Sequence, residues 1–141
     1  MKFQLLSLKT IFEAQMLRGL CANREGSDAE RFDKSCSHNL IRSKQDNRLV
    51  GCFRMLAATR ASIDTSCSAQ FYELSALACF SGSMIELGRF CIQPNEQDPD
   101  IVWIAWAALT ACADKNKISI LFGCTSFSGN GIGAHQAVFA L

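Results

Sequence analysis

The sequence predicts a mixed α/β sheet covered by helices, and three observations support this fold class. The 141 residues have the length of one domain with a sizeable core. Hydrophobic residues make up 49% of the chain and charged residues 19%, which is typical of a globular protein. Short apolar, β-favouring runs alternate along the chain with segments of helical periodicity. We therefore expect a single domain over residues 1–141.

The first residues predict a strand followed by an amphipathic helix. Phe3–Leu8 forms the first strand. Thr10 is expected to open the helix, because Glu13 three residues later completes a capping box. Four apolar residues recur at helical spacing and should form the buried face of this helix: Phe12, Met16, Leu17 and Leu20.

The middle of the chain predicts an antiparallel hairpin. Residues 23–33 are polar and are expected to form a loop or a short irregular helix. Residues 38–42 and 49–55 are β-like and flank a polar turn, so they should pair. Residues 57–80 show no clear periodicity and receive no assignment.

The second half of the chain predicts two more strands and two helices. Residues 83–92 resemble a buried strand, and the two prolines within residues 93–100 predict a loop. A helix is expected from about residue 101 to 113, followed by a buried strand over residues 118–124. A last helix is expected over residues 133–141.

Composition and cysteine spacing exclude several classes of function. The net charge of +1 shows no field of one sign, so nucleic acid is not an expected partner. No two of the eight cysteines lie closer than twelve residues, and the chain has only two histidines, so no metal site is expected. Without an export signal, a disulfide framework is not expected either. We expect a reduced, soluble, cytoplasmic protein.

Contact with a membrane surface is a further expectation that stays open. The longest apolar stretch, residues 101–113, is too short to span a bilayer. Trp103 and Trp106 on this helix could anchor it at the surface of the inner membrane, and packing in the core is the alternative.

The chain carries none of the common catalytic signatures. There is no GxSxG, Walker A or HExxH motif. The glycines of GNGIG, residues 129–133, lack the lysine of a phosphate-binding loop and fit an ordinary turn better. His38 and His135 are nearly a hundred residues apart, and each is more simply explained as a hydrogen-bonded structural residue.

Glu86 and Arg89 lie inside the apolar strand 83–92, where charges are rarely buried unless they are paired or functional. In a regular strand their side chains would point to opposite faces. Gly88 lies between them, and a glycine inside a strand commonly marks a bulge. One extra residue there would bring both charges to the same side. A regular strand with Arg89 paired elsewhere is the alternative.

Three further polar elements stand out, namely Arg18, the segment Arg31-Phe32-Asp33, and Arg54. Arg54 alternates with Phe53 and Met55, so it points away from their apolar face. Exposure to solvent on the outer face is an equal alternative to a functional role.

Several stretches in a fixed order carry a resemblance to a known family. They are Arg31-Phe32-Asp33 with Cys36 and His38, Val50-Gly51-x-Phe53-Arg54-Met55-Leu56, Phe71-Tyr72, Glu86-Leu87-Gly88-Arg89-x-Cys91-Ile92, Leu121-Phe122-Gly123-Cys124-x-Ser126-Phe127-x-Gly129, and Ala134-His135. Together they resemble the ornithine N-acyltransferases of bacterial ornithine-lipid synthesis. These belong to the GNAT-like acyltransferases and are related to the acyl-homoserine-lactone synthases. The resemblance runs from about Phe12 to the end of the chain.

The resemblance implies a fold and a reaction. The fold is GNAT-like (acyl-CoA N-acyltransferase): α/β, with helices on both faces of a mixed sheet whose fourth strand is bulged and splayed from the fifth. The reaction transfers a 3-hydroxyacyl group from acyl carrier protein to the α-amino group of ornithine, giving lyso-ornithine lipid. No cofactor is implied beyond the phosphopantetheine that carries the acyl group. Family members are about twice as long, so residues 1–141 are expected to be the N-terminal part of a longer domain, with the last strands missing.

The resemblance also implies roles for individual residues. Glu86 is the candidate base, and Arg89 with Arg54 could hold the substrate carboxylate or the pantetheine phosphate. Asp33 could pair with the δ-ammonium of ornithine or orient an arginine. The remaining candidates are Arg18, Arg31 and Phe127 for the substrate, and Cys91 and Ile92 for the pantetheine arm. A basic patch that could dock the acidic carrier protein comprises Arg42, Lys44, Arg48 and Arg60.

Two departures from the family pattern leave alternatives open. Ser37 stands where the family usually has Asp, and Glu96-Gln97 stands where it usually has Tyr-Arg. The loss of the arginine's positive charge at the second position should weaken binding of the acyl donor. One alternative is an acyl-homoserine-lactone synthase-like enzyme acting on S-adenosylmethionine. The other is an inactive protein that binds acyl carrier protein or a membrane surface without turnover.

Overall fold

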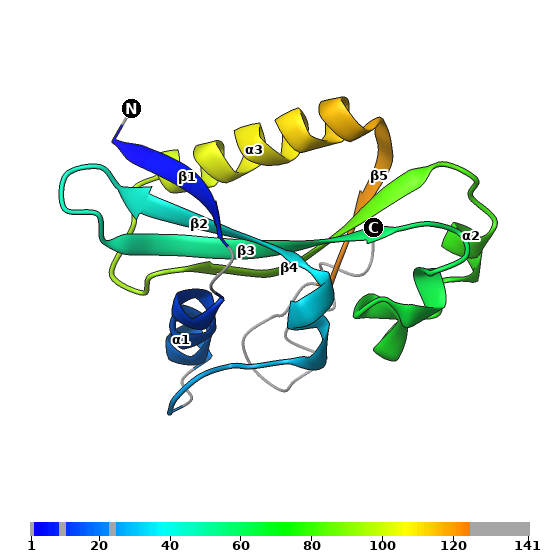
Figure 1. Cartoon of the computed structure of the whole chain (residues 1–141), viewed down its shortest axis with the longest axis horizontal. Coiled ribbons are helices and arrows are strands. Elements are labelled where there is room, and N and C mark those ends of the chain that lie inside the picture. The colour runs from blue at the N-terminus through cyan, green and yellow to red at the C-terminus, as the bar shows by residue number, and fades with distance from the viewer. Residues whose placement is uncertain (1, 9–10, 23–24, 125–141) are drawn as a thin grey trace, which may run out of the picture.

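The structure is a computed structural model that describes residues 2–8, 11–22 and 25–124 (Figure 1). Within them, five strands form one sheet in chain order. The strands are β1 (Phe3–Leu8), β2 (Ser37–Ser43), β3 (Leu49–Ala58), β4 (Ser83–Ile92) and β5 (Ile118–Phe122). Strands β1 to β4 pair antiparallel, and β5 runs parallel to β4. The predicted mixed sheet and the hairpin of β2 and β3 are therefore confirmed.

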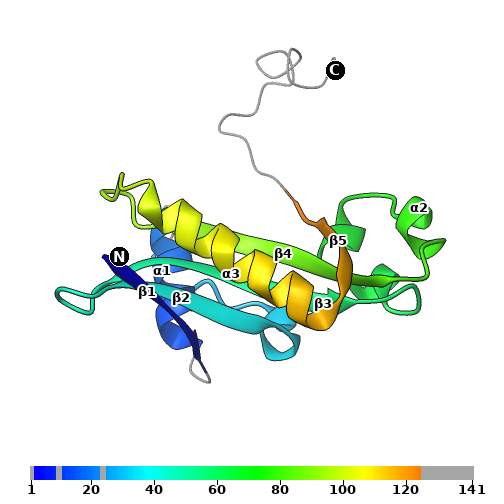
Figure 2. The same cartoon turned by 90° about the horizontal axis from the view of Figure 1, so that it is seen from above.

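Helices cover both faces of this sheet, as predicted. In Figure 1, α3 (Asp100–Asn116) lies on one face and α1 (Phe12–Cys21) on the other. Figure 2 shows α3 running above the strands as the crossover that joins β4 to the parallel β5. The remaining helices are short: η1 (Arg31–Ser35), η2 (Ile63–Thr65), η3 (Ser68–Gln70) and α2 (Ser75–Ala78). No helix in the described ranges is both long and apolar enough to cross a bilayer.

The main core lies between α3 and the sheet. The inner face of α3 presents residues spaced three and four apart, and the sheet supplies its own apolar side chains. This core comprises Ile101, Ile104, Ala105 and Leu109 from α3 with Phe3, Ile41, Val50 and Phe53 from the strands. Burying one large side chain of this kind contributes about 1.5–3 kcal/mol. Trp103 and Trp106 lie outside this core, with 70% and 50% of their surface exposed. Helix α3 is thus packed in the core through its other face, as the alternative expected, while its two Trp side chains stay exposed, and contact with a membrane surface stays a prediction.

The buried face of α1 also differs from the prediction. Phe12, Met16 and Leu20 are exposed, and of the four predicted residues only Leu17 is buried. The residues that α1 does bury are Ala14, Gln15, Leu17, Arg18 and Gly19. Gln15 and Arg18 can occupy the inner face because the carboxylates of Asp28 and Asp33, from the segment that follows α1, accept hydrogen bonds from them.

Several element bounds differ from the prediction as well: β3 runs to Ala58 instead of residue 55, and α3 runs to Asn116 instead of about residue 113. Helix α1 begins at Phe12, and Ile11 at its N-cap makes no side-chain capping bond. Thr10, expected to open this helix, lies outside the described residues. Strand β5 ends at Phe122, and its residues alternate between half-buried and exposed. It is not the fully buried strand expected, because it pairs with β4 alone among the described residues. The helix expected over residues 133–141 and the glycines of residues 129–133 lie outside the described ranges.

Strand β4 carries the predicted bulge at Gly88. The pairing with β3 passes from Cys52–Cys91 to Arg54–Gly88, so β4 has one residue more than β3 between these two pairs. Arg89 adopts a left-handed backbone with φ of 51°. A bulky residue rarely takes this conformation outside turns and irregular backbone. The irregularity therefore lies next to the glycine, as the sequence indicated.

Strands β4 and β5 separate just beyond their last paired residues, Glu86 and Phe122. Gly123 follows, and a Cβ atom at this position would overlap the carbonyl oxygen of Leu87, so only glycine allows the two backbones to approach. The extra residue of the bulge brings the side chains of Glu86 and Arg89 to one cavity. The predicted bulged and splayed strand is confirmed.

A Gly123→Ala substitution tests this close approach. The added methyl group meets backbone, which can yield only if β5 moves away from β4. We expect the free energy of unfolding, measured in urea, to fall by about 1–3 kcal/mol. The matched control is Ser119→Ala at an exposed position of β5, which should change it by less than about 0.5 kcal/mol. Equal stability of both variants would contradict the described contact.

Candidate active site

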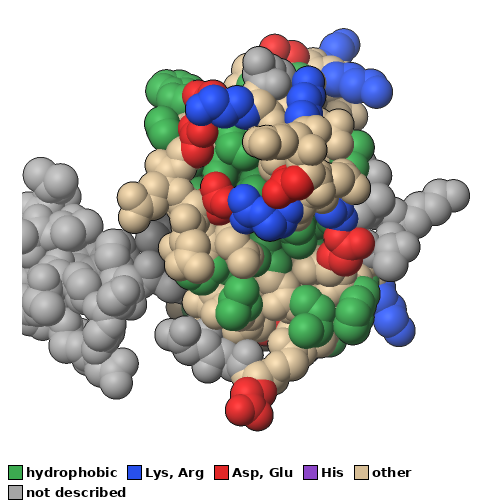
Figure 3. Space-filling model, turned by 90° about the vertical axis from the view of Figure 1, so that its left-hand side faces the viewer, with side chains coloured by type: hydrophobic (Ala, Val, Ile, Leu, Met, Phe, Trp, Pro, Cys, Tyr) green, Lys and Arg blue, Asp and Glu red, His purple; other side chains and the backbone are tan. Residues whose placement is uncertain are grey.

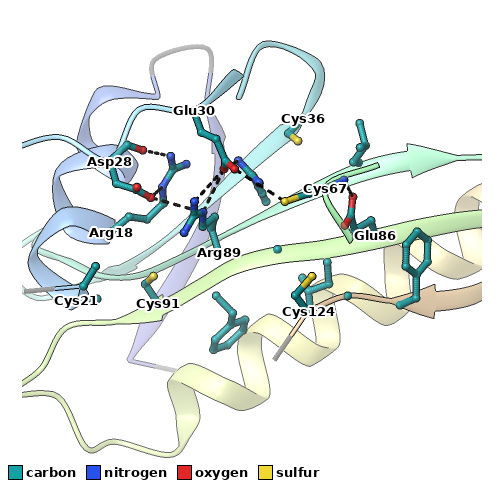
Figure 4. A pocket seen from close by; sticks show the side chains of 18 of the residues that line it. Arg18, Cys21, Asp28, Glu30, Cys36, Cys67, Glu86, Arg89, Cys91 and Cys124 are labelled. Carbon is teal, nitrogen blue, oxygen red and sulfur yellow. Dashed lines mark hydrogen bonds and ion pairs between the residues drawn. The ribbon is translucent and has the colours of Figure 1, made fainter. Parts of the chain in front are cut away.

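An open cavity of about 990 Å³ lies where β4 leaves β5. Residues from both faces of the sheet line it, including Cys21 of α1 and Trp106 of α3. Glu86 and Arg89 line it from β4, on either side of the bulge (Figure 4). Its size is that of a small-molecule site, and its two-sided lining is what a splayed sheet provides.

A buried charge cluster centred on Asp33 forms the wall beside α1. Arg18 Nη1 and Nη2 each lie 2.9 Å from a carboxylate oxygen of Asp33, which makes a bidentate pair. Gln15 Nε2 and Arg54 Nη1 donate to the same two oxygens at 2.9 and 3.0 Å. Burial alone would raise the pKa of Asp33, but the hydrogen bonds from Arg18 and Gln15 outweigh it and hold this pKa below its usual range.

Glu30 and Asp28 extend the cluster into the cavity. Glu30 Oε2 lies 2.6 Å from Arg54 Nη1 and 3.1 Å from Arg89 Nη2. Asp28 Oδ2 lies 3.2 Å from Arg18 Nε and 3.5 Å from Arg89 Nε. Figure 4 shows this chain of alternating charges beside β4. The side chains of Arg18 and Arg54 are 2% and 3% exposed, whereas that of Arg89 is 37% exposed.

The segment that carries these carboxylates is held locally. Glu30 and Asp33 cap η1 reciprocally, since each side chain accepts the backbone N–H of the other residue. The backbone N–H of Asp28 donates to the carbonyl of Gln15 on α1 at 3.0 Å. His38 Nε2 lies 2.9 Å from the carbonyl oxygen of Asp33, in line with the structural interpretation of this histidine. These bonds fix Asp33 below α1.

The carboxylate of Glu86 is buried and accepts hydrogen bonds from Cys67 and Ser68 at the start of η3. Its Oε1 accepts hydrogen bonds from the Ser68 N–H and hydroxyl at 2.6 and 2.5 Å. Its Oε2 accepts one from the Cys67 N–H at 2.9 Å. Cys124 Sγ donates in turn to Ser68 Oγ at 3.2 Å. Glu86 therefore lines the cavity and also anchors η3.

The fold brings most of the predicted residues together, and their roles stay predictions. Six of the predicted residues are among those that line the cavity: Arg18, Arg54, Glu86, Arg89, Cys91 and Ile92. Asp33 lies directly behind them with its oxygens filled by its hydrogen-bond donors. Arg31 does not join this group: it is exposed, donates to Gln70 and covers the ring of Phe32. Phe127 lies outside the described residues.

Sequence reasoning missed Asp28, Glu30, Gln15 and Ser68. Asp28 and Glu30 belong to a polar segment that was expected to form a loop or a short irregular helix, and nothing in its composition marks two of its acids as ion-pair partners. Gln15 was missed because the buried face of α1 was predicted from its apolar residues alone. The equal alternative of an exposed Arg54 is wrong, because this side chain is buried by its two carboxylates.

The predicted basic patch does not form one surface. Arg42 pairs with Glu13, and Arg48 pairs with Asp46 and Glu96. Arg60 follows the far end of β3, a ten-residue strand that spans roughly 33 Å. Figure 3, which views the hairpin end of the sheet, shows acidic and basic side chains interspersed. The charges of this end are largely neutralised in pairs.

No group of three or more His, Cys, Asp or Glu side chains in the described ranges is placed to hold a metal ion.

The mixed sheet with its bulged fourth strand is the fold of a GNAT-class domain. The acetyltransferase (GNAT) domain family matches residues 9–107, which is more than half of the chain. The chain therefore belongs to this family.

Within that class, the chain is similar to curated L-ornithine N(alpha)-acyltransferases. It is 29% identical over 119 residues to the enzyme of Brucella abortus (strain 2308), covering 79% of this chain and 42% of the relative. It is 30% identical over 120 residues to that of Rhodobacter capsulatus, covering 80% and 46%. The chain thus spans less than half the length of these relatives. The resemblance drawn from the motifs is confirmed.

Solved structures confirm the fold. The acyl-homoserine-lactone synthase LasI superposes with a TM-score of 0.64 at 19% identity, over 98% of this chain and 76% of LasI. FeeM, an N-acyl amino acid synthase from uncultured soil microbes, gives a TM-score of 0.65 at 15% identity, over 99% and 77%. At such identities the likeness concerns the fold alone.

Stability in acid tests the Asp33 cluster. Because the folded pKa of Asp33 is depressed, its contribution is complete above its usual pKa of 3.8 and is lost as the pH falls toward the folded value. We expect the free energy of unfolding to decrease below about pH 4. Asp33→Asn should cost about 3–5 kcal/mol at pH 7, because it leaves buried guanidinium groups without their carboxylate.

The same variant should flatten the acid dependence, and Asp64→Asn at an exposed position is the control that should keep it. An Asp33→Asn protein as stable as wild type at pH 7, with an unchanged slope below pH 4, would contradict the central role of this pair.

Proposed function

We propose that the chain provides the catalytic part of an N-acyltransferase that moves a 3-hydroxyacyl group from acyl carrier protein to the α-amino group of ornithine, giving lyso-ornithine lipid. The observation that carries the proposal is the cavity at the β4 bulge, where a carboxylate and an arginine share one side of the opened sheet. The similarity to four curated ornithine acyltransferases supports the choice of acceptor.

The charges around the cavity favour a cationic acceptor. Three arginines, Arg18, Arg54 and Arg89, face four carboxylates. The carboxylates are those of Asp28, Glu30, Asp33 and Glu86. Together, the three arginines and the four carboxylates carry a net formal charge of −1. Ornithine at neutral pH carries two ammonium groups and one carboxylate, hence one positive charge. Electrostatic complementarity of this kind selects for the acceptor and against anionic amines.

Arg89 is the arginine best placed to bind the acceptor carboxylate or the pantetheine phosphate. The guanidinium groups of Arg18 and Arg54 are buried against carboxylates, and releasing either would leave a buried charge unpaired. Arg89 is more exposed and can exchange Glu30 for a substrate anion at lower cost. Asp33 orients Arg18 and Arg54, which is one of the two roles predicted for it.

Acyl transfer requires a deprotonated amine and a stabilised oxyanion. The α-amino group has a pKa near ~8, so a base helps it to attack the thioester. Glu86 is that base, directly or through a water molecule. A bulge releases backbone N–H groups from the ladder, and one such donor to the thioester oxyanion contributes about 3 kcal/mol to transition-state binding.

A transfer assay tests the reaction itself. The chain is incubated with 3-hydroxyacyl carrier protein and ornithine, and N-acyl-ornithine is sought by mass spectrometry. We expect product with ornithine and none with S-adenosylmethionine. Acylation of S-adenosylmethionine instead would favour a signal synthase. Binding of the carrier protein without any product would favour a binding protein and contradict the proposal.

Variants of Glu86 separate its role as a base from its role as an anchor. Glu86→Gln should lower kcat about 10²–10⁴-fold with little change in KM, because it removes the proton acceptor. Ser68→Ala removes one hydrogen bond to Glu86 and keeps the carboxylate, so it should retain most of kcat. Glu73→Gln at an exposed site outside the cavity is the matched control. Full activity of Glu86→Gln would remove the base assignment.

A further inference from the structure

Thiol groups are concentrated around the cavity. Five of its lining residues are cysteines: Cys21, Cys36, Cys67, Cys91 and Cys124. At the end beside α1, three thiols from three elements meet. Cys21 is the last residue of α1, and Cys52 of β3 is the register partner of Cys91 on β4. Figure 4 shows Cys21 and Cys91 side by side next to Arg18.

Cys91 differs chemically from its neighbours. Hydrogen bonding from the Cys52 thiol, helped by the Cys21 thiol and the charges of Arg18 and Arg89, outweighs burial and lowers the pKa of Cys91 to about 7. Burial and the hydrogen bond to Cys91 raise the pKa of Cys21 to about 11. Of the two thiols, that of Cys91 therefore ionises more readily, and the thiolate is the form that attacks electrophiles.

We propose that Cys91 is an oxidation site for hydroperoxides and that Cys21 resolves the product as a disulfide across the α1 end of the cavity. The Cys91 thiolate attacks one peroxide oxygen, the O–O bond breaks, and the leaving oxygen takes a proton. Cys91 is left as a sulfenic acid. The Cys21 thiol then attacks this sulfur, an S–S bond forms and water leaves. Two thiols lose two electrons, and the peroxide gains them.

Cys21 suits the resolving role better than Cys52. Opposed residues of an antiparallel pair keep their Cβ atoms about 4.5–5.5 Å apart, whereas a disulfide needs about 3.8 Å. Joining Cys52 to Cys91 would therefore strain the β3–β4 ladder next to the bulge. Cys21 ends a helix and is outside the ladder, and its thiol already donates to the carbonyl of Ile92 at 3.2 Å. Forming this bond would move the end of α1 and leave the β3–β4 pairing in place.

The disulfide would tie α1 to β4 beside Arg18 and Arg89. It would fix the width of the cavity at the end where the pantetheine arm is expected to contact Cys91 and Ile92. The expected loss of acyl transfer on oxidation rests on the proposed function. The formation of the disulfide does not depend on the proposed function, so it is measured by peptide mapping, independently of acyl transfer.

Peptide mapping without reductant tests the chemistry. The protein is treated with substoichiometric hydrogen peroxide, its free thiols are blocked, and it is digested. We expect a linked pair of peptides containing Cys21 and Cys91. In Cys21→Ser the sulfenic acid persists and is captured on Cys91 by dimedone. In Cys91→Ser the linked pair of peptides is absent, and the rate of the fastest thiol oxidation falls roughly 5- to 10-fold. A thiol of lower pKa has a larger thiolate fraction but a less nucleophilic sulfur, and for Cys91 the first effect is the larger one.

Cys79→Ser is the matched control, because Cys79 is exposed and lies outside the cavity lining. It should leave both the linked pair and the fast oxidation unchanged. Oxidation that begins at Cys79 or Cys124 with Cys91 intact would overturn the proposal. A Cys52–Cys91 linkage would overturn the resolving role of Cys21. Failure of acyl transfer in the reduced protein, with the Cys21–Cys91 disulfide still forming, would overturn the proposed function alone.

Discussion

The paired charges around Asp33 are the constraint on which the rest of the site depends. Asp33 receives Arg18 from α1 and Arg54 from β3, and it lies on the segment between them. Isolated in the interior, any of these charges would be costly, and removing one partner of such a pair typically costs about 3–5 kcal/mol. The cluster therefore fixes the position of α1 and of η1 against the sheet, beside the apolar contact that Ala14 and Leu17 make with Leu40 and Cys52.

The bulge in β4 makes a cavity out of this arrangement. The extra residue after Gly88 turns Arg89 toward Glu30 and Asp28, while Glu86 remains anchored to η3. One end of the cavity is thus defined by ion pairs and the other by a carboxylate that accepts backbone hydrogen bonds. Both ends are held by these contacts, and the proposed acyl-pantetheine arm would lie in the opening between β4 and β5. Preorganised polar groups of this kind are what acyl transfer requires.

Local patterns in the sequence were sufficient for the number and order of the strands and for the bulge, but not for the far end of β3 or the burial of β5. The bounds of β4 follow from its apolar run, and the bulge follows from a glycine between two charges that could not otherwise share a side. The orientation of α1 could not be found in this way. Its apolar residues Phe12, Met16 and Leu20 predicted the wrong inner face, because Arg18 is neutralised by an acid fifteen residues further along.

Ion pairing over such sequence distances leaves no periodic signal, so Asp28 and Glu30 were also missed. Pairing within the structure is what decides which charges are available for a substrate, and only the folded chain shows that Arg89 is more accessible than Arg54.

A structure of the chain with a non-hydrolysable thioether analogue of 3-hydroxyacyl-pantetheine tests the central claim most directly. We expect the analogue's acyl carbon to lie against the β4 bulge, with Glu86 and Arg89 on the same side of it and the arm passing between β4 and β5. An analogue bound away from the bulge, with the cavity between β4 and β5 empty, would contradict it.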